Sequence, residues 1–324
     1  MENVSLVGTP VENVVGEFEF PDGKKRLATK RTKVDRIGET HLEYVEHTSL
    51  PSTYEGKLTM PGKIFLVILK NVLALCSEFK MTFDSGINIK VVDPAHVAMF
   101  DMSIPKESFM EYDMPPKVDV CMNADKLHEL KVKAKDAVFI RMKFALKEKK
   151  AVEDGDAYTT FNYECESFVL QFGVVTRSIT PIDSSMVSTP KIPPINADNY
   201  VVMKTSYVHE AVNQCAKLSD ATKFELFEDR FEISSRGQFD ASNKEEVALN
   251  RFERDQIKDM HLIGTSVHSL YPIEYIAKTF NASLSSEDVK ISFKSDYPMK
   301  AEFRMNVDAF EPISMVYYLA PRME

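Results

Sequence analysis

The chain has 324 residues, 44% of them apolar and 27% charged, so it has enough apolar material for two ordinary domains or one large one. Forty lysines and arginines stand against 49 aspartates and glutamates, which gives a formal net charge of -9. This balance excludes a uniformly basic nucleic-acid coat but allows a basic patch on an acidic body. With 11 glycines and 16 prolines, the chain is neither collagen-like nor of low complexity.

The first 54 residues differ from the rest and predict an N-terminal extension. Residues 17–20 alternate polar and apolar side chains, and Pro21-Asp22-Gly23 is a turn signal, so a hairpin is expected. A basic run follows, opposed only by Asp35, and such a run is typical of a solvated surface arm. Its members are Lys24, Lys25, Arg26, Lys30, Arg31, Lys33 and Arg36.

From Pro61 onward the pattern of apolar residues becomes regular. A stripe with helical spacing predicts a first helix, and its members are Phe65, Ile68, Leu69, Val72, Leu73 and Leu75. Residues 81–92 predict two short strands around a turn at 84–86. A second helix is expected from Asn123, a good N-cap, through Ala134. Strands are expected at 138–144 and 166–174.

The same order of elements then recurs. Helical stripes run from Val208 to Leu218 and from Leu270 to Phe280, and strands are expected within 224–234, 289–295 and 300–307. A shift of 143 residues places Phe65 on Val208 and Leu127 on Leu270, and a shift of 144 places Phe83 on Phe227. The series predicts two copies of one α+β domain, at 55–177 and 198–324. Between them, the proline-rich residues 178–197 predict an extended connector.

Motifs for chemistry are scarce. No nucleophile elbow, phosphate-binding loop or dinucleotide fingerprint occurs, and no pair of histidines has metal-ligand spacing. Asp93, His96 and Asp101 form one acid–imidazole group, for which a turn residue beside a loop histidine is favoured over a metal or catalytic site. The cysteines (Cys76, Cys121, Cys165, Cys215) are too far apart for a metal or redox motif, so we expect reduced thiols in an intracellular protein. We therefore predict no enzyme activity, no metal and no cofactor.

No targeting or membrane segment is expected. The N-terminus has neither the basic start nor the apolar run of a signal peptide. The most apolar stretch, residues 64–76, is shorter than the ~20 residues that span a bilayer. Lysines opposite the apolar stripes of the helices suggest nucleic-acid binding only weakly, because such lysines usually mark solvated faces and glutamates lie among them.

Two segments resemble the sliding-clamp family, the proliferating cell nuclear antigen and its archaeal relatives. Residues 91–99, VVDPAHVAM, are similar to that family's D-P-A/S-x-V-x-M/L loop, and residues 317–324, YYLAPRME, to its C-terminus. Residues 295–305, SDYPMKAEFRM, also fit. The resemblance covers roughly residues 54–324 and is closest to archaeal members, so the N-terminal extension departs from the family pattern.

The resemblance implies two similar domains per subunit with helices on one face of antiparallel sheets. Three identical subunits would form a closed ring around double-stranded DNA, without sequence preference, and act as a processivity factor. The helices would line the hole, with these lysines facing DNA: Lys63, Lys70, Lys131, Lys217 and Lys278. A cytoplasmic location follows for an archaeal-like protein, and a nuclear one for a eukaryotic source.

The resemblance also implies an outer pocket for partner proteins that carry a short clamp-binding motif, among them DNA polymerase and a clamp loader. The matching positions are Val92, His96, Val97, Met99, Ile192, Pro193, Pro298, Tyr318, Leu319, Ala320, Pro321 and Arg322. Two alternatives stay open: a checkpoint-type or hetero-oligomeric ring subunit, and an enzyme of unrecognised type. For the basic N-terminal extension, the hypothesis is that it adds phosphate contacts or a partner surface.

Overall fold

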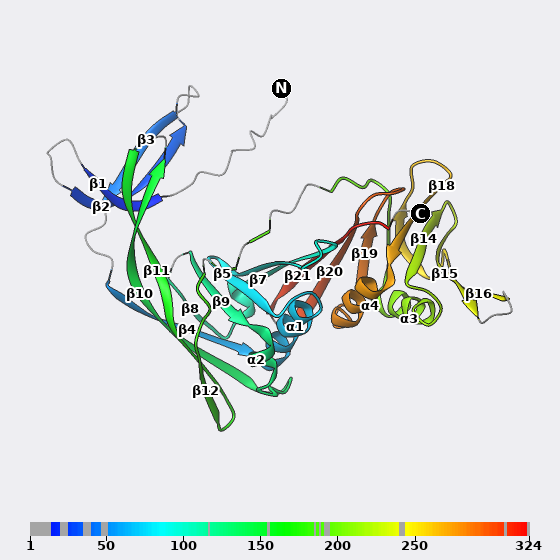
Figure 1. Ribbon diagram of the computed structural model, residues 1–324, viewed down its shortest axis with the longest axis horizontal. Helices are drawn as coiled ribbons and strands as arrows, with labels where there is room; N and C mark the ends of the chain where they lie inside the picture. Colours follow the sequence, from blue (N-terminus) through cyan, green and yellow to red (C-terminus); the bar gives the residue numbers. More distant parts are fainter. Residues whose placement is uncertain are drawn as a thin grey trace. The chain divides into compact units, whose positions relative to one another are not determined.

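The computed structural model describes the backbone of residues 14–19, 25–34, 40–46, 51–115, 117–153, 156–184, 186–187, 189–190, 195–239, 244–307 and 310–322. The chain forms two compact units, drawn in Figure 1. One comprises residues up to Gly56 together with Met142–Ser167, and the other comprises Lys57–Arg141 and Phe168–Glu324. Residues 142–167 thus group with the N-terminal residues, although the sequence places them in the first repeat. The boundaries at 54, 177 and 197 stay predictions.

From β4 onward the chain contains two repeats with the same order of strands and helices, which confirms the predicted duplication. The first repeat runs β4 (Thr53–Pro61), α1 (Gly62–Leu73), β5 (Glu78–Phe83), β6 (Gly86–Val92), β7 (Ala98–Pro105), η1 (Lys106–Ser108), β8 (Glu111–Asp113), β9 (Val118–Asn123), α2 (Ala124–His128), β10 (Ala137–Glu153), β11 (Asp156–Phe172) and β12 (Val175–Ile179). Apart from the short η1, each of these elements has a counterpart in the second repeat.

The second repeat runs β13 (Tyr200–Lys204), α3 (Thr205–Cys215), β14 (Ala221–Phe227), β15 (Arg230–Phe239), β16 (Lys244–Glu253), β17 (Ile257–His261), β18 (Ser266–Pro272), α4 (Ile273–Ala282), β19 (Asp288–Ser292), β20 (Met299–Val307) and β21 (Phe310–Leu319).

Each repeat contributes two antiparallel groups of strands in equivalent order. The first repeat forms β8-β4-β10-β11-β12 and β7-β6-β5-β9, and the second forms β17-β13-β19-β20-β21 and β16-β15-β14-β18. Strand β21 pairs with β7, so one group from each repeat joins into a single nine-stranded sheet. The two repeats are therefore connected by backbone hydrogen bonds as well as by the chain itself.

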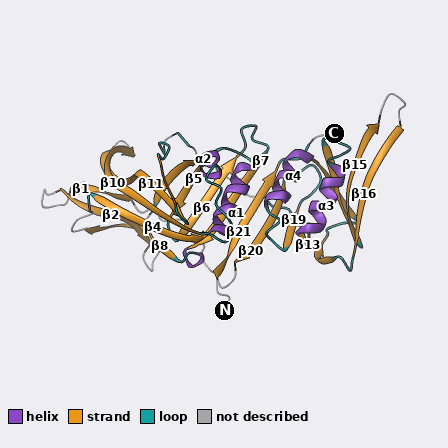
Figure 2. Cartoon of the chain, turned by 90° about the horizontal axis from the view of Figure 1, so that it is seen from below, coloured by secondary structure: helices purple, strands orange, loops and turns teal. Residues whose placement is uncertain are grey.

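Four helices form a row in the larger unit. Helix α1 contacts α2 and α4, and α4 contacts α3, so the order is α2-α1-α4-α3, as Figure 2 shows. Their apolar stripes are buried: Ile64, Phe65 and Ile68 of α1 and Val208 and Val212 of α3 are almost fully covered. Their opposite faces carry exposed polar residues.

The second predicted helix is shorter than the sequence suggests. Asn123 is the N-cap, its side chain accepting a hydrogen bond from the Lys126 N–H at 3.0 Å, but α2 ends at His128 and does not reach Ala134. Lys131 has a left-handed backbone, with φ of 56°, and the Lys133 N–H donates to the Asp136 carboxylate at 2.7 Å. The left-handed residue and this backbone-to-side-chain hydrogen bond replace the next helical turn. Apolar spacing does not reveal such local competition.

The smaller unit combines β1 (Val14–Glu19), β2 (Lys25–Val34) and β3 (Thr40–Glu46) with the distal parts of β10 and β11. The pairing order is β3-β2-β1-β11-β10, and β1 meets β11 with Gly16 opposite Thr160. The β1–β2 pairing confirms the predicted hairpin, while its turn, Pro21-Asp22-Gly23, lies outside the described residues. Residues 25–34 of the basic run form the middle strand of the three.

Candidate functional site

A row of half-buried apolar side chains crosses the nine-stranded sheet. Val92 on β6 lies opposite Met99 on β7, and Met99 lies opposite Tyr318 on β21. The apolar row ends at Tyr318, which lies opposite the charged Lys300 on β20. Directly opposite residues on one face have Cβ atoms about 5 Å apart, so these side chains form one continuous surface. Three of the predicted pocket residues are thereby brought together.

The chain beyond β21 extends this surface. The Ala320 N–H donates to the Val97 carbonyl at 2.9 Å, and Ala320 and Pro321 are half-buried. Arg322 lies at another contact: its N–H donates to the Leu270 carbonyl at 2.7 Å, and its guanidinium pairs with Asp220 at 2.6 Å. The hydrogen bond from Arg322 lowers the pKa of the Asp220 carboxyl.

Leu319 differs from its neighbours in the predicted pocket. It is only 5% exposed, and strand alternation places it on the face opposite Tyr318, as it does the buried Tyr317. Its side chain therefore belongs to the core beneath the surface. Pro298 is half-buried just before β20, while Ile192 and Pro193 lie outside the described residues.

The loop at residues 93–98 is organised by Asp93. The Asp93 carboxylate accepts hydrogen bonds from the N–H groups of Ala95, Val97 and Ala98 at 2.9, 2.7 and 2.6 Å, and from the Tyr275 hydroxyl at 2.8 Å. Burial opposes ionisation of Asp93, but these hydrogen bonds outweigh burial and lower its pKa. The carboxylate is thus a turn-forming group.

His96 and Asp101, the other two members of the predicted acid–imidazole group, lie in separate environments. His96 is exposed and has a left-handed backbone with φ of 57°. Asp101 pairs with Lys90 on the neighbouring strand at 3.4 Å. Within the described part of the chain, no group of three or more His, Cys, Asp or Glu side chains is arranged to bind a metal ion.

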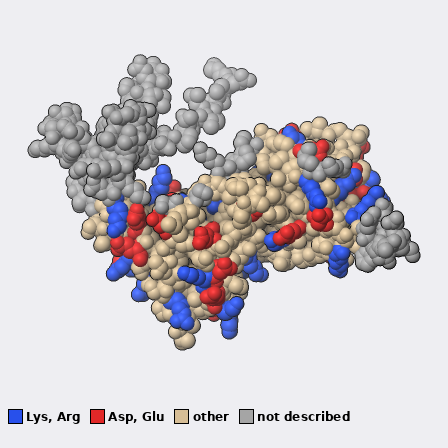
Figure 3. Space-filling view, in the orientation of Figure 1, with Lys and Arg blue, Asp and Glu red and all other residues tan. Residues whose placement is uncertain are grey.

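The five predicted DNA-facing lysines are all exposed, on or beside the row of helices. Lys63 and Lys70 lie on α1, Lys131 follows α2, and no ion pair joins these three to another described residue. Lys217 donates to the Gln214 side chain at 3.4 Å. Lys278 on α4 pairs with Glu274 at 2.6 Å, so its charge is partly compensated. Figure 3 shows cations and acids interspersed on the face in view.

Comparison with known proteins decides the family. The DNA polymerase sliding clamp of Thermoplasma acidophilum is 31% identical over 269 residues, covering 83% of this chain and 99% of the relative. That of Picrophilus torridus is 33% identical over 251 residues, covering 77% and 91%. The chain belongs to the DNA polymerase sliding clamp family.

Solved structures show the same clamp fold. This clamp matches "C-terminal region of FEN-1 bound to A. fulgidus PCNA" with a TM-score of 0.67 and 23% identity, over 83% of this chain and 99% of that chain. It matches the PCNA2-PCNA3 complex from Sulfolobus tokodaii with a TM-score of 0.62 and 19% identity, over 84% and 100%. No protein-family model matches the sequence. Among the described residues, no helix of the clamp is long and apolar enough to cross a bilayer.

Sequence reasoning missed two polar contacts that join the repeats of the clamp. The first centres on Asn71 of α1, whose side-chain oxygen accepts from the hydroxyls of Tyr317 at 2.8 Å and Ser283 at 3.2 Å. Its amide donates to the Val67 carbonyl at 2.7 Å, and all three side chains are buried. The second is the Tyr275–Asp93 hydrogen bond. The one sequence signal for these contacts is Asn71 itself, a polar residue within an apolar helical stripe.

Proposed function

We propose that three copies of this chain close into a ring around double-stranded DNA and tether polymerase and other replication proteins to it. The observation that carries the proposal is the unequal use of equivalent strands in the two repeats. Strands β21 and β7 pair within the chain. Their counterparts, β12 and β16, each pair with one described strand only, β11 and β15 respectively.

These two edges supply a head-to-tail joint. If β12 of one copy pairs with β16 of the next, the joint between copies repeats the joint inside each copy. Every repeat would then make the same pair of contacts, which is the condition for a closed, heterologous ring. An exposed strand edge can pair with any other exposed strand, which leads to aggregation. Pairing with a defined strand of the next copy covers the edge and prevents this.

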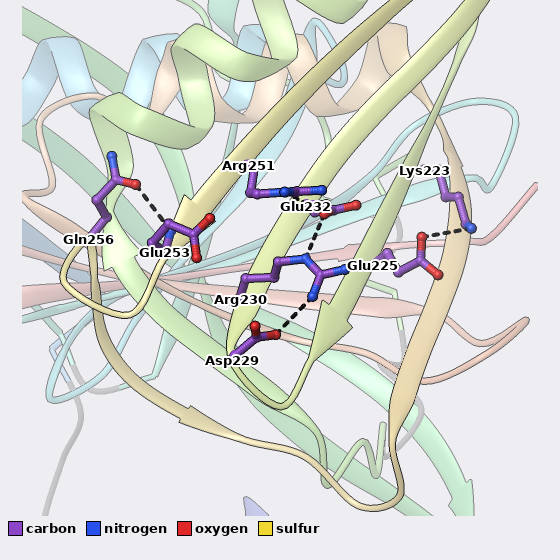
Figure 4. A network of polar contacts seen from close by, with 8 residues as sticks. All are labelled: Lys223, Glu225, Asp229, Arg230, Glu232, Arg251, Glu253 and Gln256. Carbon is purple, nitrogen blue, oxygen red and sulfur yellow. Dashed lines mark hydrogen bonds and ion pairs between the residues drawn. The ribbon is translucent and has the colours of Figure 1, made fainter.

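Strand β16 carries two exposed apolar side chains that a docked copy would cover. Val247 and Leu249 are 51% and 52% exposed and lie on the same face of the strand. Beside them, Arg251 is fixed by Glu232, which accepts from Arg251 and Arg230 at 2.8 Å each, as Figure 4 shows. An ordered edge loses less side-chain entropy when a partner strand docks on it.

The row of helices would face DNA. Exposed cations are few, and acids such as Glu210 and Glu274 lie among them, so phosphate contacts would be weak and independent of sequence. Weak contacts suit a ring that slides, because enclosure keeps it on the duplex. The proposed mechanism needs no chemistry on a substrate, and we place the protein in the cytoplasm of an archaeal-like cell, where it would meet replicating DNA.

The surface formed by Val92, Val97, Met99, Tyr318 and Ala320 is the proposed partner site. Val92, Met99 and Tyr318 lie in one register row. Val97 of the loop at residues 93–98 and Ala320 after β21 adjoin this row, and a backbone hydrogen bond joins these two residues. Such a surface fits short segments with apolar and aromatic anchors. The solved structure of the C-terminal region of FEN-1 bound to A. fulgidus PCNA supports this class of partner.

Processive synthesis tests the proposal. With a clamp loader and polymerase on a circular primed template, the wild-type protein should lengthen the products. The Met99→Ala/Tyr318→Ala variant should lose at least about tenfold in partner affinity and most of this stimulation, because it removes two adjacent anchors from one row. Met110→Ala, at an exposed methionine elsewhere, is the matched control. Equal stimulation by both variants would contradict the partner site.

The N-terminal extension is proposed to add phosphate contacts through the basic strand β2. Deleting residues 1–50 should reduce the slope of log affinity for DNA against log salt by roughly one for each phosphate contact that is lost. Fluorescence anisotropy with duplex DNA at several salt concentrations measures this slope. An unchanged slope would contradict the proposed phosphate contacts. The remaining hypothesis would be that the extension forms a surface for partner proteins.

A hetero-oligomeric ring is the second candidate, and the PCNA2-PCNA3 complex from Sulfolobus tokodaii is the observation that keeps it open. Native mass measurement separates the two candidates. A homotrimer of the purified chain supports the first, and a chain that does not close with itself supports the second.

A further inference from the structure

The loop at residues 93–98 belongs to the first repeat, yet one of the groups that donates a hydrogen bond to it comes from the second repeat. Tyr275 lies on α4 and donates its hydroxyl to Asp93 Oδ2 at 2.8 Å, across 182 residues of sequence. Asp93 is 2% exposed, so this hydrogen bond is shielded from solvent at the carboxylate. A hydrogen bond to a charged, buried acceptor is among the stronger ones in proteins.

The two oxygens of Asp93 have different tasks. Oδ1 accepts the N–H groups of Val97 and Ala98, both inside the loop. Oδ2 accepts the N–H of Ala95 and the hydroxyl of Tyr275. Among the described residues, Tyr275 is the side chain that ties this carboxylate to an element outside its own loop, so α4 fixes where the folded loop sits.

The loop position matters for the neighbouring surface. The Val97 carbonyl accepts the Ala320 N–H at 2.9 Å, which couples the loop to the chain after β21. His96 is held in a left-handed backbone conformation, which is unfavourable for a non-glycine residue and persists only where surrounding contacts impose it. A small shift of Asp93 would therefore move His96, Val97 and Ala320 together.

Tyr275 is itself well placed for this task. It projects from a regular helix whose residues Ile273, Ile276 and Phe280 are buried. The Lys278 ammonium lies 5.8 Å from its ring centroid, and Glu274 pairs with Lys278. The hydrogen bond to Asp93 raises the pKa of Tyr275 to about 12, because the Asp93 carboxylate favours the protonated, donating form of the hydroxyl.

We propose that Tyr275 is a positioning residue for the partner site: through Asp93 it sets the loop at residues 93–98 and thereby the affinity for partner segments. This inference rests on the proposed function of the neighbouring surface. It assigns to a helix of the second repeat a role in a site formed mainly by the first repeat and the C-terminal strand.

The test compares Tyr275→Phe with Tyr200→Phe in the full-length protein. Tyr200 also donates its hydroxyl to an aspartate, Asp259, at 3.0 Å, but on β13, away from the loop. The probe is a synthetic peptide of the FEN-1 C-terminal region that binds A. fulgidus PCNA, with affinity measured by calorimetry. Tyr275→Phe should weaken binding about fivefold to tenfold and Tyr200→Phe less than about twofold.

A second readout separates positioning from a general loss of stability. In ¹H–¹⁵N spectra, the Ala95, Val97 and Ala98 amides should shift in Tyr275→Phe and not in Tyr200→Phe, because all three donate to Asp93. Equal peptide affinity of wild type and Tyr275→Phe, or unshifted amides, would overturn the inference. If wild type itself does not bind the peptide, the proposed partner site is wrong, and the amide shifts alone decide whether Tyr275 positions the loop.

Discussion

Replacing Asn71 with alanine is expected to destabilise the protein by about 3–5 kcal/mol. The Asn71 oxygen accepts the hydroxyls of Tyr317 and Ser283, and both of these side chains are buried. Alanine would leave two buried donors without partners, at about 1–3 kcal/mol each, and a small cavity. The midpoint of urea unfolding, followed by far-ultraviolet circular dichroism, measures the loss.

A mutant cycle checks the cause of this loss. Tyr317→Phe alone should cost about 1–2 kcal/mol, because Asn71 keeps its contact with Ser283. On a Tyr317→Phe/Ser283→Ala background, Asn71→Ala should cost at least about 1 kcal/mol less than on the wild type, since no hydroxyl is then stranded. Strictly additive costs would show that the three side chains do not act as one network.

The Val247→Glu/Leu249→Glu variant is expected to convert the ring to monomers and to abolish stimulation of polymerase. Both residues lie on the edge strand β16, where the next copy would dock, and each would bring a carboxylate into the joint. A penalty of about 3 kcal/mol per joint would weaken each contact roughly a hundredfold.

Mass photometry over a range of protein concentrations measures this change. The matched control is Ile263→Glu/Leu284→Glu, which adds the same charge at two exposed apolar residues outside the strands. The control should stay trimeric, and its circular dichroism spectrum and that of the β16 variant should match the wild type. A trimeric β16 variant, or monomers in both variants, would place the joint elsewhere.

Much of each repeat could be predicted because its signals are local. Apolar side chains at helical spacing around Phe65 and Val208 mark helices whose stripes are buried in the structure. Asp93 follows a strand and precedes a proline, and it is a turn residue in the structure, as the sequence indicates. The near-constant shift between the copies indicates the duplication from the sequence alone.

The structure separates two adjacent residues that the predicted partner site groups together, and the site itself stays a prediction. Strand alternation alone separates Tyr318 from Leu319, but the sequence motif groups both in one pocket. The structure places Leu319 in the core and Tyr318 in the surface row with Met99. Which face of β21 is covered depends on its pairing with β7, over 200 residues away in sequence, and no local signal encodes that pairing.

The sequence by itself determined the two repeats, most of the helices and many strands of the larger unit, and the turn at Asp93, since spacing and turn chemistry act over a few residues. Tertiary structure decided the end of α2, the length of the β10–β11 hairpin and which strands of each repeat pair with only one other described strand. It also decided the contacts of Asn71 with Tyr317 and of Asp93 with Tyr275, which span 246 and 182 residues. Such contacts form only after packing has brought distant, individually unremarkable polar side chains together in a solvent-poor interior, where an unpaired group is costly.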